Sequence, residues 1–192
     1  MTSPEPTQAI IDDFVGNAHG SFARVKELLD QYPSLVNANA SWNETALAAA
    51  AQTGQKKIAE LLLTAGAPMD ICAAAMLGLA DRVREFLRAD PAAAHAIGAH
   101  GIPVLYHAAN RGNKDVAELL LAHGSDVNAG EGGNPALHGA VLFRQPHMAE
   151  WLLAHGARVN AKNYEGKTPL AVALHHGDNV MADLLKRHGG TE

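Results

Sequence analysis

Residues 117–124, with the sequence AELLLAHG, decide the fold, because this stretch returns along the chain. It recurs as AEWLLAHG at residues 149–156 and as ADLLKRHG at residues 182–189, so the copies follow one another at a nearly constant interval. An earlier copy, AELLLTAG, occupies residues 59–66, which is almost two such intervals before the first stretch. A regular period of about 33 residues is typical of a solenoid of stacked repeats, and a degenerate repeat is expected in the gap.

The degenerate repeat can be found from a second internal match. RVREFL at residues 82–87 echoes RVKELL at residues 24–29, and the two are again separated by almost two periods. The first four repeats therefore look like a duplicated pair, and two more complete the array. We expect a tail at residues 1–7 and one domain at residues 8–190, with repeats at residues 8–39, 40–70, 71–97, 98–129, 130–162 and 163–190.

Each repeat is predicted to contain two short helices. Its apolar residues follow helical spacing in two segments that could not bury them alone, and stacking would supply the core. Aromatic residues make up only 5% of the chain while alanine and leucine abound, which favours close-packed helices over sheets. A threonine or proline opens the first helix of most repeats, and a glycine follows the second. The fold class is therefore all-α.

Two signatures connect these repeats with a known family. GKTPLAVA at residues 166–173 follows the ankyrin pattern GxTPLHxA except at the histidine, and PALHGA at residues 135–140 is a weaker copy. GSDVNA at residues 124–129 and GARVNA at residues 156–161 match the family's second marker. The chain resembles the ankyrin-repeat family over about residues 10–190. The resemblance implies a solenoid of about six stacked helix-turn-helix units with short hairpin-like loops.

Composition and charge limit which compartment and which kinds of partner are expected for this chain. The formal net charge is -5, and the 15 lysines and arginines are scattered among 20 acidic residues, so nucleic acid is a poor candidate partner. No apolar stretch approaches the roughly 20 residues of a membrane span, and the N-terminus lacks a signal peptide's basic and apolar regions. The single cysteine, Cys72, lies in an alanine-rich run and is interpreted as a buried thiol in a reducing compartment. We expect a cytoplasmic protein.

Both ends of the array look like caps. Thr7 is placed to cap a first helix that has one apolar stripe, and the last helix is unusually polar. These ends predict that the solenoid is the whole chain, that no separate catalytic domain accompanies it, and that it is a monomer.

The family resemblance also implies where a partner would bind. Similar proteins bind through the loop tips and the inner face of each first helix, at positions that the signature leaves free. Those positions hold Trp42, Glu44, Gln52, His100, Ile102, Asn110, Arg111, Glu131, Asn134, Leu142, Phe143, Tyr164, Glu165, Lys167, His175 and His176. Several are of the types enriched in interface hot spots, although some could instead pack on neighbouring loops.

Two places depart from the repeat pattern. Arg144 takes the inter-helix turn position that Gly54, Gly112 and Gly177 occupy elsewhere, so it is expected to adopt a backbone typical of glycine, with Pro146 opening the next helix. The hairpin of the third repeat is blurred, which predicts a local change in curvature.

Eleven histidines raise the questions of a metal site and of catalysis. His175 and His176 point about 100° apart on a helix, and the chain has neither a His-x-x-x-His motif nor a cysteine pair, so no metal or other cofactor is expected. No nucleophile or phosphate-loop motif appears. The predicted function is a protein-protein interaction module that binds a partner on its concave face. One alternative is a small enzyme or ligand-binding protein using a groove between repeats four to six, and an enclosed pocket would distinguish it. Another is a purely structural spacer, whose concave residues would be inert to substitution.

Overall fold

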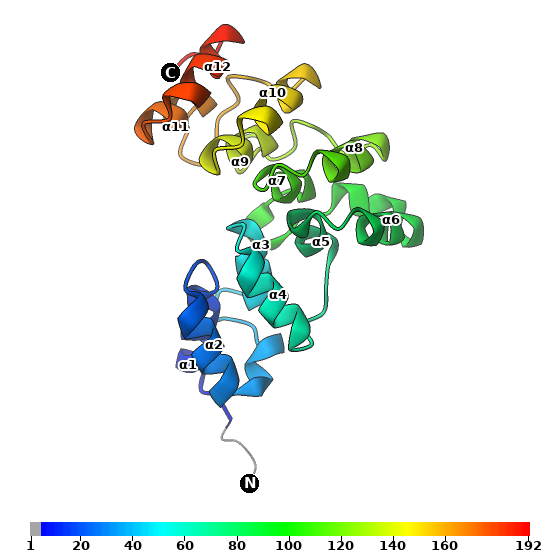
Figure 1. Ribbon diagram of the computed structural model, residues 1–192, viewed down its shortest axis with the longest axis vertical. Helices are drawn as coiled ribbons and strands as arrows, with labels where there is room; N and C mark the ends of the chain where they lie inside the picture. Colours follow the sequence, from blue (N-terminus) through cyan, green and yellow to red (C-terminus); the bar gives the residue numbers. More distant parts are fainter. Residues whose placement is uncertain (1–4) are drawn as a thin grey trace.

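A computed structural model describes residues 5–192 (Figure 1). These residues form twelve α-helices and no β-strand, which confirms the all-α prediction. The predicted tail at residues 1–7 falls partly on residues 1–4, which lie outside the described residues.

The α-helices form six consecutive pairs, and each pair is called a unit below. In chain order the units are α1 (Gln8–Asn17) and α2 (Phe22–Gln31), α3 (Ala46–Gln52) and α4 (Lys56–Thr64), α5 (Ile71–Leu77) and α6 (Ala80–Ala89), α7 (Val104–Ala109) and α8 (Lys114–Ala122), α9 (Ala136–Leu142) and α10 (Pro146–Ala154), and α11 (Pro169–His175) and α12 (Asn179–Arg187). Three short 3-10 helices, η1 (Pro33–Asn37), η2 (Pro91–His95) and η3 (Ala99–Gly101), join the units.

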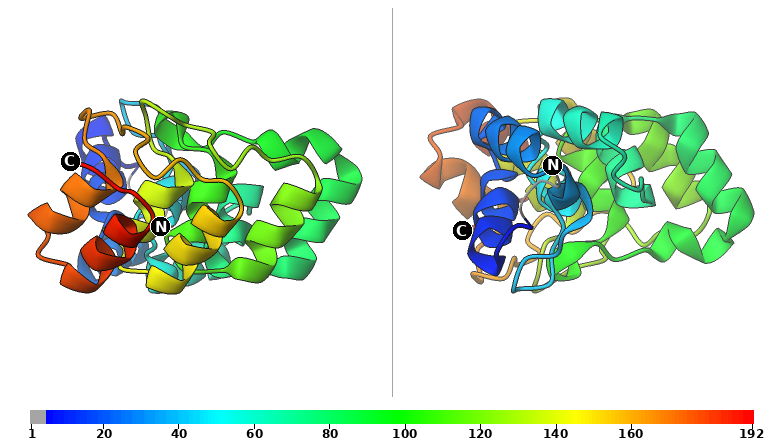
Figure 2. Two further views of the ribbon diagram at one scale, coloured as in Figure 1. Left: turned by 90° about the horizontal axis from the view of Figure 1, so that it is seen from above. Right: turned by 90° about the horizontal axis from the view of Figure 1, so that it is seen from below.

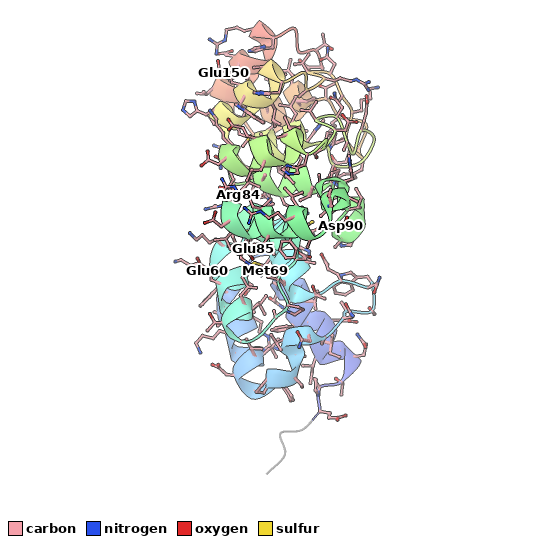
Figure 3. The ribbon with its side chains drawn as sticks, turned by 90° about the vertical axis from the view of Figure 1, so that its right-hand side faces the viewer. Glu60, Met69, Arg84, Glu85, Asp90 and Glu150 are labelled. Carbon is pink, nitrogen blue, oxygen red and sulfur yellow. The ribbon has the colours of Figure 1, made fainter. Side chains whose placement is uncertain are left out.

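The repeated stretch AELLLAHG supplies the same core position to successive units. Leu62, Leu120 and Leu152 are fully buried, whereas the glutamates of the motif face solvent. Burying each leucine contributes about 1.5–3 kcal/mol of stability, and no single unit could bury it alone. The first helices stack in chain order from α1 to α11, and Figure 3 shows Glu60 of α4 and Glu150 of α10 along the same side of the ribbon.

Helix ends follow the predicted chemistry. The Thr7 hydroxyl accepts a hydrogen bond from the backbone N–H of Ile10 at 3.4 Å, which confirms the predicted cap. Arg144 has a φ of 53°, in the left-handed region, and Pro146 is the first residue of α10, so both expectations for this turn are confirmed.

The third unit lacks the hairpin tip that its neighbours have. Isolated β-bridges mark the hairpin tips of the second and fourth units, Asn39 with Thr45 and Ile97 with Pro103. In the third unit, residues 65–70 pass directly from α4 to α5. Without a tip between them, the second and fourth units touch, and the Asn110 side chain donates a 3.0 Å hydrogen bond to the Ala51 carbonyl. The irregular hairpin expected after α6 is absent, because η2 and the bridge at Ile97 follow α6 as η1 and the bridge at Asn39 follow α2, and the change in curvature stays a prediction.

The outer side of the array has a cleft between the second and third units. The cleft, of about 280 Å³, lies beside α4 and is lined by Lys56, Glu60, Leu63, Thr64, Leu77 and Leu79. Seen along the array in Figure 2, both terminal units lie on one side while the third and fourth units extend to the other. The inner faces of the second, fourth, fifth and sixth units therefore border one concave surface.

Two further expectations concern Cys72 and membranes. Cys72 is buried, and this burial raises the pKa of its thiol, as predicted for a structural cysteine. Among residues 5–192, no helix combines the length and the apolar character needed to span a bilayer.

Candidate functional site

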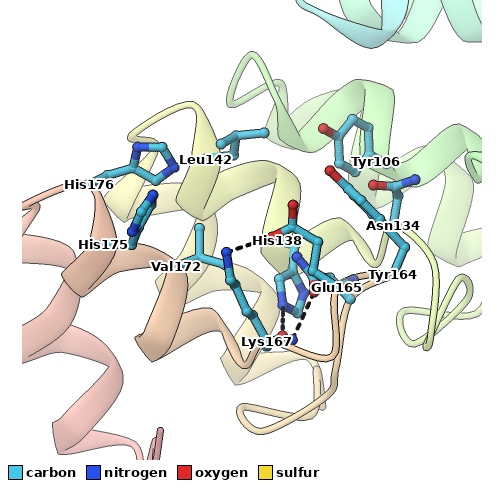
Figure 4. A pocket seen from close by; sticks show the side chains of 11 residues that line it. Tyr106, Asn134, His138, Leu142, Tyr164, Glu165, Lys167, Val172, His175 and His176 are labelled. Atoms are coloured by element: carbon cyan, nitrogen blue, oxygen red, sulfur yellow. Dashed lines mark hydrogen bonds and ion pairs between the residues drawn. The ribbon is translucent and has the colours of Figure 1, made fainter.

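Two cavities adjoin on the concave surface. The first, called the sixth-unit cavity, has a volume of about 250 Å³ and is lined by Tyr106, Asn134, His138, Leu142, Asn163, Tyr164, Glu165, Lys167, Val172, His175 and His176 (Figure 4). The second, called the central cavity, has a volume of about 510 Å³ and is lined by Gln52, Thr53, His100, Ile102, Tyr106, Gly133, Asn134, Leu142, Phe143 and Tyr164. Because they share part of their lining, the two cavities form one groove, called the inner groove below.

Tyr106 is the side chain on which both cavities depend. Tyr106 is 4% exposed, and its ring packs edge-on against Phe143, with ring centroids 6.5 Å apart. Gly139 on the next first helix makes room for it, because a Cβ there would lie only 2.8 Å from Cδ2 of the ring. Burial raises the pKa of the Tyr106 hydroxyl to about 12, so this side chain is neutral at physiological pH.

Exposed apolar groups lie above this buried ring. Leu142, at the end of α9, is 45% exposed, and Tyr164, in the tip of the sixth unit, is 68% exposed. In Figure 4 the rings of Tyr106 and Tyr164 lie on the same side of the sixth-unit cavity. Large apolar side chains that remain exposed within a concave surface are typical of interaction sites.

An ion pair forms the polar rim of the sixth-unit cavity. The Lys167 ammonium lies 2.7 Å from the Glu165 carboxylate, and this hydrogen bond lowers the pKa of Glu165. The backbone N–H groups of both residues donate to Oδ1 of Asn163, at 3.0 Å and 2.9 Å, which holds the loop in shape. The Glu165 carboxylate is therefore ionised, and its negative charge is balanced by Lys167 of the same loop.

His138 ties the fifth unit to the sixth beneath this rim. Its Nε2 lies 3.0 Å from the Lys167 carbonyl oxygen, so Nε2 carries the hydrogen and donates. Burial lowers the pKa of His138, although the hydrogen bond opposes this shift. The ring is therefore neutral, and it positions the loop that bears Lys167.

The structure corrects the expectation for Glu44. Its side chain is fully buried and lies between histidines of two other units, with Oε2 3.3 Å from Nε2 of His100 and 3.6 Å from Nε2 of His19. The Trp42 indole N–H donates to the same oxygen at 2.8 Å. Glu44 thus connects the first, second and fourth units beneath the surface and is not available to a partner.

Asn110 and Ile102 are also buried. Asn110 is fully buried because its amide donates to the carbonyl oxygens of Ala51 and Gln52, at 3.0 Å and 3.2 Å, at the end of α3. Asn110 was predicted to bind a partner, but its buried amide instead joins the fourth unit to the second. Ile102 is buried as well, but it lines the floor of the central cavity.

The groove brings together most of the other predicted positions. Its lining includes Gln52, His100, Ile102, Asn134, Leu142, Phe143, Tyr164, Glu165, Lys167, His175 and His176. Three of the predicted partner-binding residues are exposed but lie outside both cavities. Trp42 is at the tip of the second unit, Glu131 pairs with Arg158, and Arg111 lies beside Phe143 and Gly54.

Two models of a known protein family match parts of this chain. Residues 71–163 match a family model described as ankyrin repeats in three copies, and residues 42–74 match the model of a single ankyrin repeat. The chain is an ankyrin-repeat protein. Ankyrin repeats generally serve as protein-protein interaction modules. No curated protein matches the chain.

The ankyrin signature explains why sequence reasoning missed Tyr106. The fifth unit of this ankyrin-repeat protein keeps the signature histidine as His138, whereas in PVLYHA at residues 103–108 the same position holds Tyr106. This substitution was visible in the sequence. Its consequence was not, because only the position of Gly139 on the next helix turns the tyrosine into the shared wall of two cavities.

The groove's histidines show no convergence toward a metal. The rings of His175 and His176 meet edge to face with centroids 5.3 Å apart. Within the part of the chain that the structure describes, no three histidine, cysteine or acidic side chains are grouped so that they could hold a metal ion.

Proposed function

We propose that this ankyrin-repeat protein binds another protein in the inner groove. The observation that carries the proposal is the groove itself, which draws its lining from four units and combines a buried aromatic floor with exposed Leu142 and Tyr164. Apolar anchors surrounded by polar groups are the usual anatomy of a protein interface.

The groove would bind a partner with little internal rearrangement. Its loops are held by hydrogen bonds between units, as from Asn110 to α3 and from His138 to the Lys167 carbonyl. A preorganised surface loses less conformational entropy on binding, so a larger share of the contact energy appears as affinity.

The test is affinity capture from the source cell with matched variants. Leu142→Ala/Tyr164→Ala removes two exposed apolar side chains from the groove, whereas Phe22→Ala/Val180→Ala removes a similar pair, 40% and 70% exposed, from the second helices α2 and α12. We expect the groove variant to lose about tenfold in captured partner, on the order of 1.4 kcal/mol for two hot-spot truncations, and the control to bind normally.

Amide hydrogen exchange of the captured complex would then locate the interface. Protection should concentrate in α9, in the tip at residues 163–167 and at the end of α3. Equal loss of partner in both variants, or protection confined to the second helices, would refute binding in the groove.

The alternative of a ligand-binding protein or enzyme predicts a different result. A small molecule held by the sixth-unit cavity would raise the melting temperature of the chain as its concentration increases, and Tyr164→Ala would abolish the shift. Capture that depends on Leu142 and Tyr164, without any such shift, favours the protein-binding function.

We also propose that the chain acts as a monomer in a reducing compartment such as the cytoplasm. The last helix, α12, presents polar residues at the end of the array, and the only cysteine is a buried thiol. Light scattering that gives a dimer mass would contradict the first part of this proposal.

A further inference from the structure

Charged side chains of both signs are concentrated in the second helices, which form the outer layer of the solenoid. From the second unit to the sixth, the first helices α3, α5, α7, α9 and α11 contain no aspartate or glutamate. Every second helix from α4 to α12 carries at least one, as Glu60, Glu85 and Glu150 illustrate (Figure 3). The acidic residues of these helices are therefore concentrated on the outer layer.

The inter-helix turns of the fourth and fifth units each carry an arginine, whereas the sixth unit's turn carries Asp178, whose carboxylate accepts from the backbone N–H of Met181 at 3.1 Å. Arg111 lies within the fourth unit's turn, between α7 and α8. Its side chain and that of Phe143 both come within 4 Å of the position where a Cβ on Gly54 would be. Arg144 occupies the next turn and donates from Nη2 to the His176 carbonyl at 3.1 Å, at the rim of the sixth-unit cavity. Among the described residues neither arginine forms an ion pair, although both are exposed.

The acidic groups near the groove do not offset these two charges. Glu165 is paired with Lys167 at 2.7 Å, and Glu131 is paired with Arg158 outside the cavities. Glu44 is covered and lies between two histidines. An incoming carboxylate therefore meets two arginines on successive turns and no exposed, unpaired acid in the groove lining.

The sixth-unit cavity sets the apolar part of the recognition. Leu142 and Val172 form aliphatic walls, and the rings of Tyr106 and Tyr164 form aromatic ones, in a volume of about 250 Å³. This space suits one large side chain inserted from a partner. Aromatic rings gain further from edge-to-face contacts with tyrosine, which aliphatic side chains cannot make.

We propose that the partner presents an acidic segment with an aromatic anchor, whose ring enters the sixth-unit cavity while flanking carboxylates face Arg111 and Arg144. This inference rests on the proposed function and specifies the chemistry of the partner. Opposite charges along a groove fix the orientation of a bound segment and raise its association rate, while the buried anchor supplies most of the affinity.

The test uses unlabelled synthetic peptides and isothermal titration calorimetry with the full chain. The probe is a short peptide with a central phenylalanine, two aspartates on each side, and glycine and serine elsewhere. Three matched peptides replace the aspartates by asparagine, the aspartates by lysine, or the phenylalanine by alanine. We expect the acidic peptide to bind about fivefold more tightly than the asparagine peptide at low salt, and the lysine and alanine peptides to bind at least about tenfold more weakly than the acidic one.

Variants then assign the charge effect to the two turns. Arg111→Gln/Arg144→Gln should weaken the acidic peptide about three- to tenfold and leave the asparagine peptide unchanged. Arg88→Gln/Arg187→Gln, which removes the same charge from exposed positions on the second helices α6 and α12, should leave both affinities unchanged.

The outcomes separate this inference from the proposed function. Equal binding of acidic, neutral and basic peptides, equal losses in the two double variants, or no peptide binding while lysate capture still requires Leu142 and Tyr164 would overturn the acidic segment and leave the groove as a protein site. If Leu142→Ala/Tyr164→Ala captured as much partner as the unmodified chain, the proposed function itself would be refuted.

Discussion

Replacing Gly139 by alanine tests the contact on which the groove depends. Within α9 the change favours the helix by about 0.5–1 kcal/mol, because alanine has the higher helix propensity. The new Cβ would, however, lie 2.8 Å and 3.0 Å from Cδ2 and Cε2 of the Tyr106 ring. That ring is wedged against His107 and Phe143, so it cannot move without repacking. Overpacking of a core typically costs about 1–3 kcal/mol, so we expect a net loss of about 1 kcal/mol.

Urea denaturation followed by circular dichroism would measure this loss, as a midpoint lowered by about 0.5 M. Gly16→Ala is the matched control, because Gly16 lies in α1 and the nearest atom to its Cβ would be 4.0 Å away on Trp42. It should stabilise the chain. In a Tyr106→Ala background, Gly139→Ala should also become stabilising, by about 0.5–1 kcal/mol. A Gly139→Ala effect of the same size and sign with and without the tyrosine ring would refute the steric argument.

Three more predictions concern the joints between units and the response to pH. Asn110→Ala removes two hydrogen bonds that join the fourth unit to the end of α3 and should lower the free energy of unfolding by about 1–3 kcal/mol, whereas an unchanged urea midpoint would argue against this joint. Arg144→Gly relieves a left-handed backbone but loses the bond to His176, so we expect a net gain of about 0.5 kcal/mol in the same assay; a loss would mean that the side-chain bond outweighs the strain. Burial lowers the pKa of His107 and His138 below the ordinary 6.5, so the folded chain binds fewer protons than the unfolded chain. Stability should therefore be constant above about pH 7.5 and fall below pH 6.5, by up to about 1.4 kcal/mol per pH unit for each histidine. His107→Gln should roughly halve this slope in urea titrations from pH 5 to 8, and an unaltered slope would exclude His107 as a source.

The inner groove follows from a missing piece of the third unit. With no hairpin tip between them, the second and fourth units meet through Asn110 and through Glu44 with His100. This contact brings Gln52 and Thr53 of the second unit to the edge of a cavity otherwise built by the last three units. Restoring a normal tip in the third unit would separate these surfaces and shorten the groove.

Local features were predictable because each depends on a few neighbouring residues. The repeated AELLLAHG stretch shows its period and its buried leucine in the sequence, and stacking is the only way such a short unit can bury that leucine. The cap at Thr7 and the left-handed backbone of Arg144 are decided within one turn of chain. The positions on loop tips, such as Tyr164 and Lys167, could be listed because the family signature leaves them free.

Contacts between units that are far apart in the sequence could not be predicted from the sequence. Glu44 and Asn110 were predicted to bind a partner because their positions are free in the signature, yet both are buried where the second unit meets the fourth. Tyr106 is only a departure from the signature in the sequence, and Gly139 makes it the wall of two cavities. The chain's own periodicity determines the helices, their caps and the buried stripe of each unit, since these energies act within a single repeat and its immediate neighbours. The curvature of the array decides which side chains remain exposed and which converge, because burial and pairing depend on the unit that lies opposite in space.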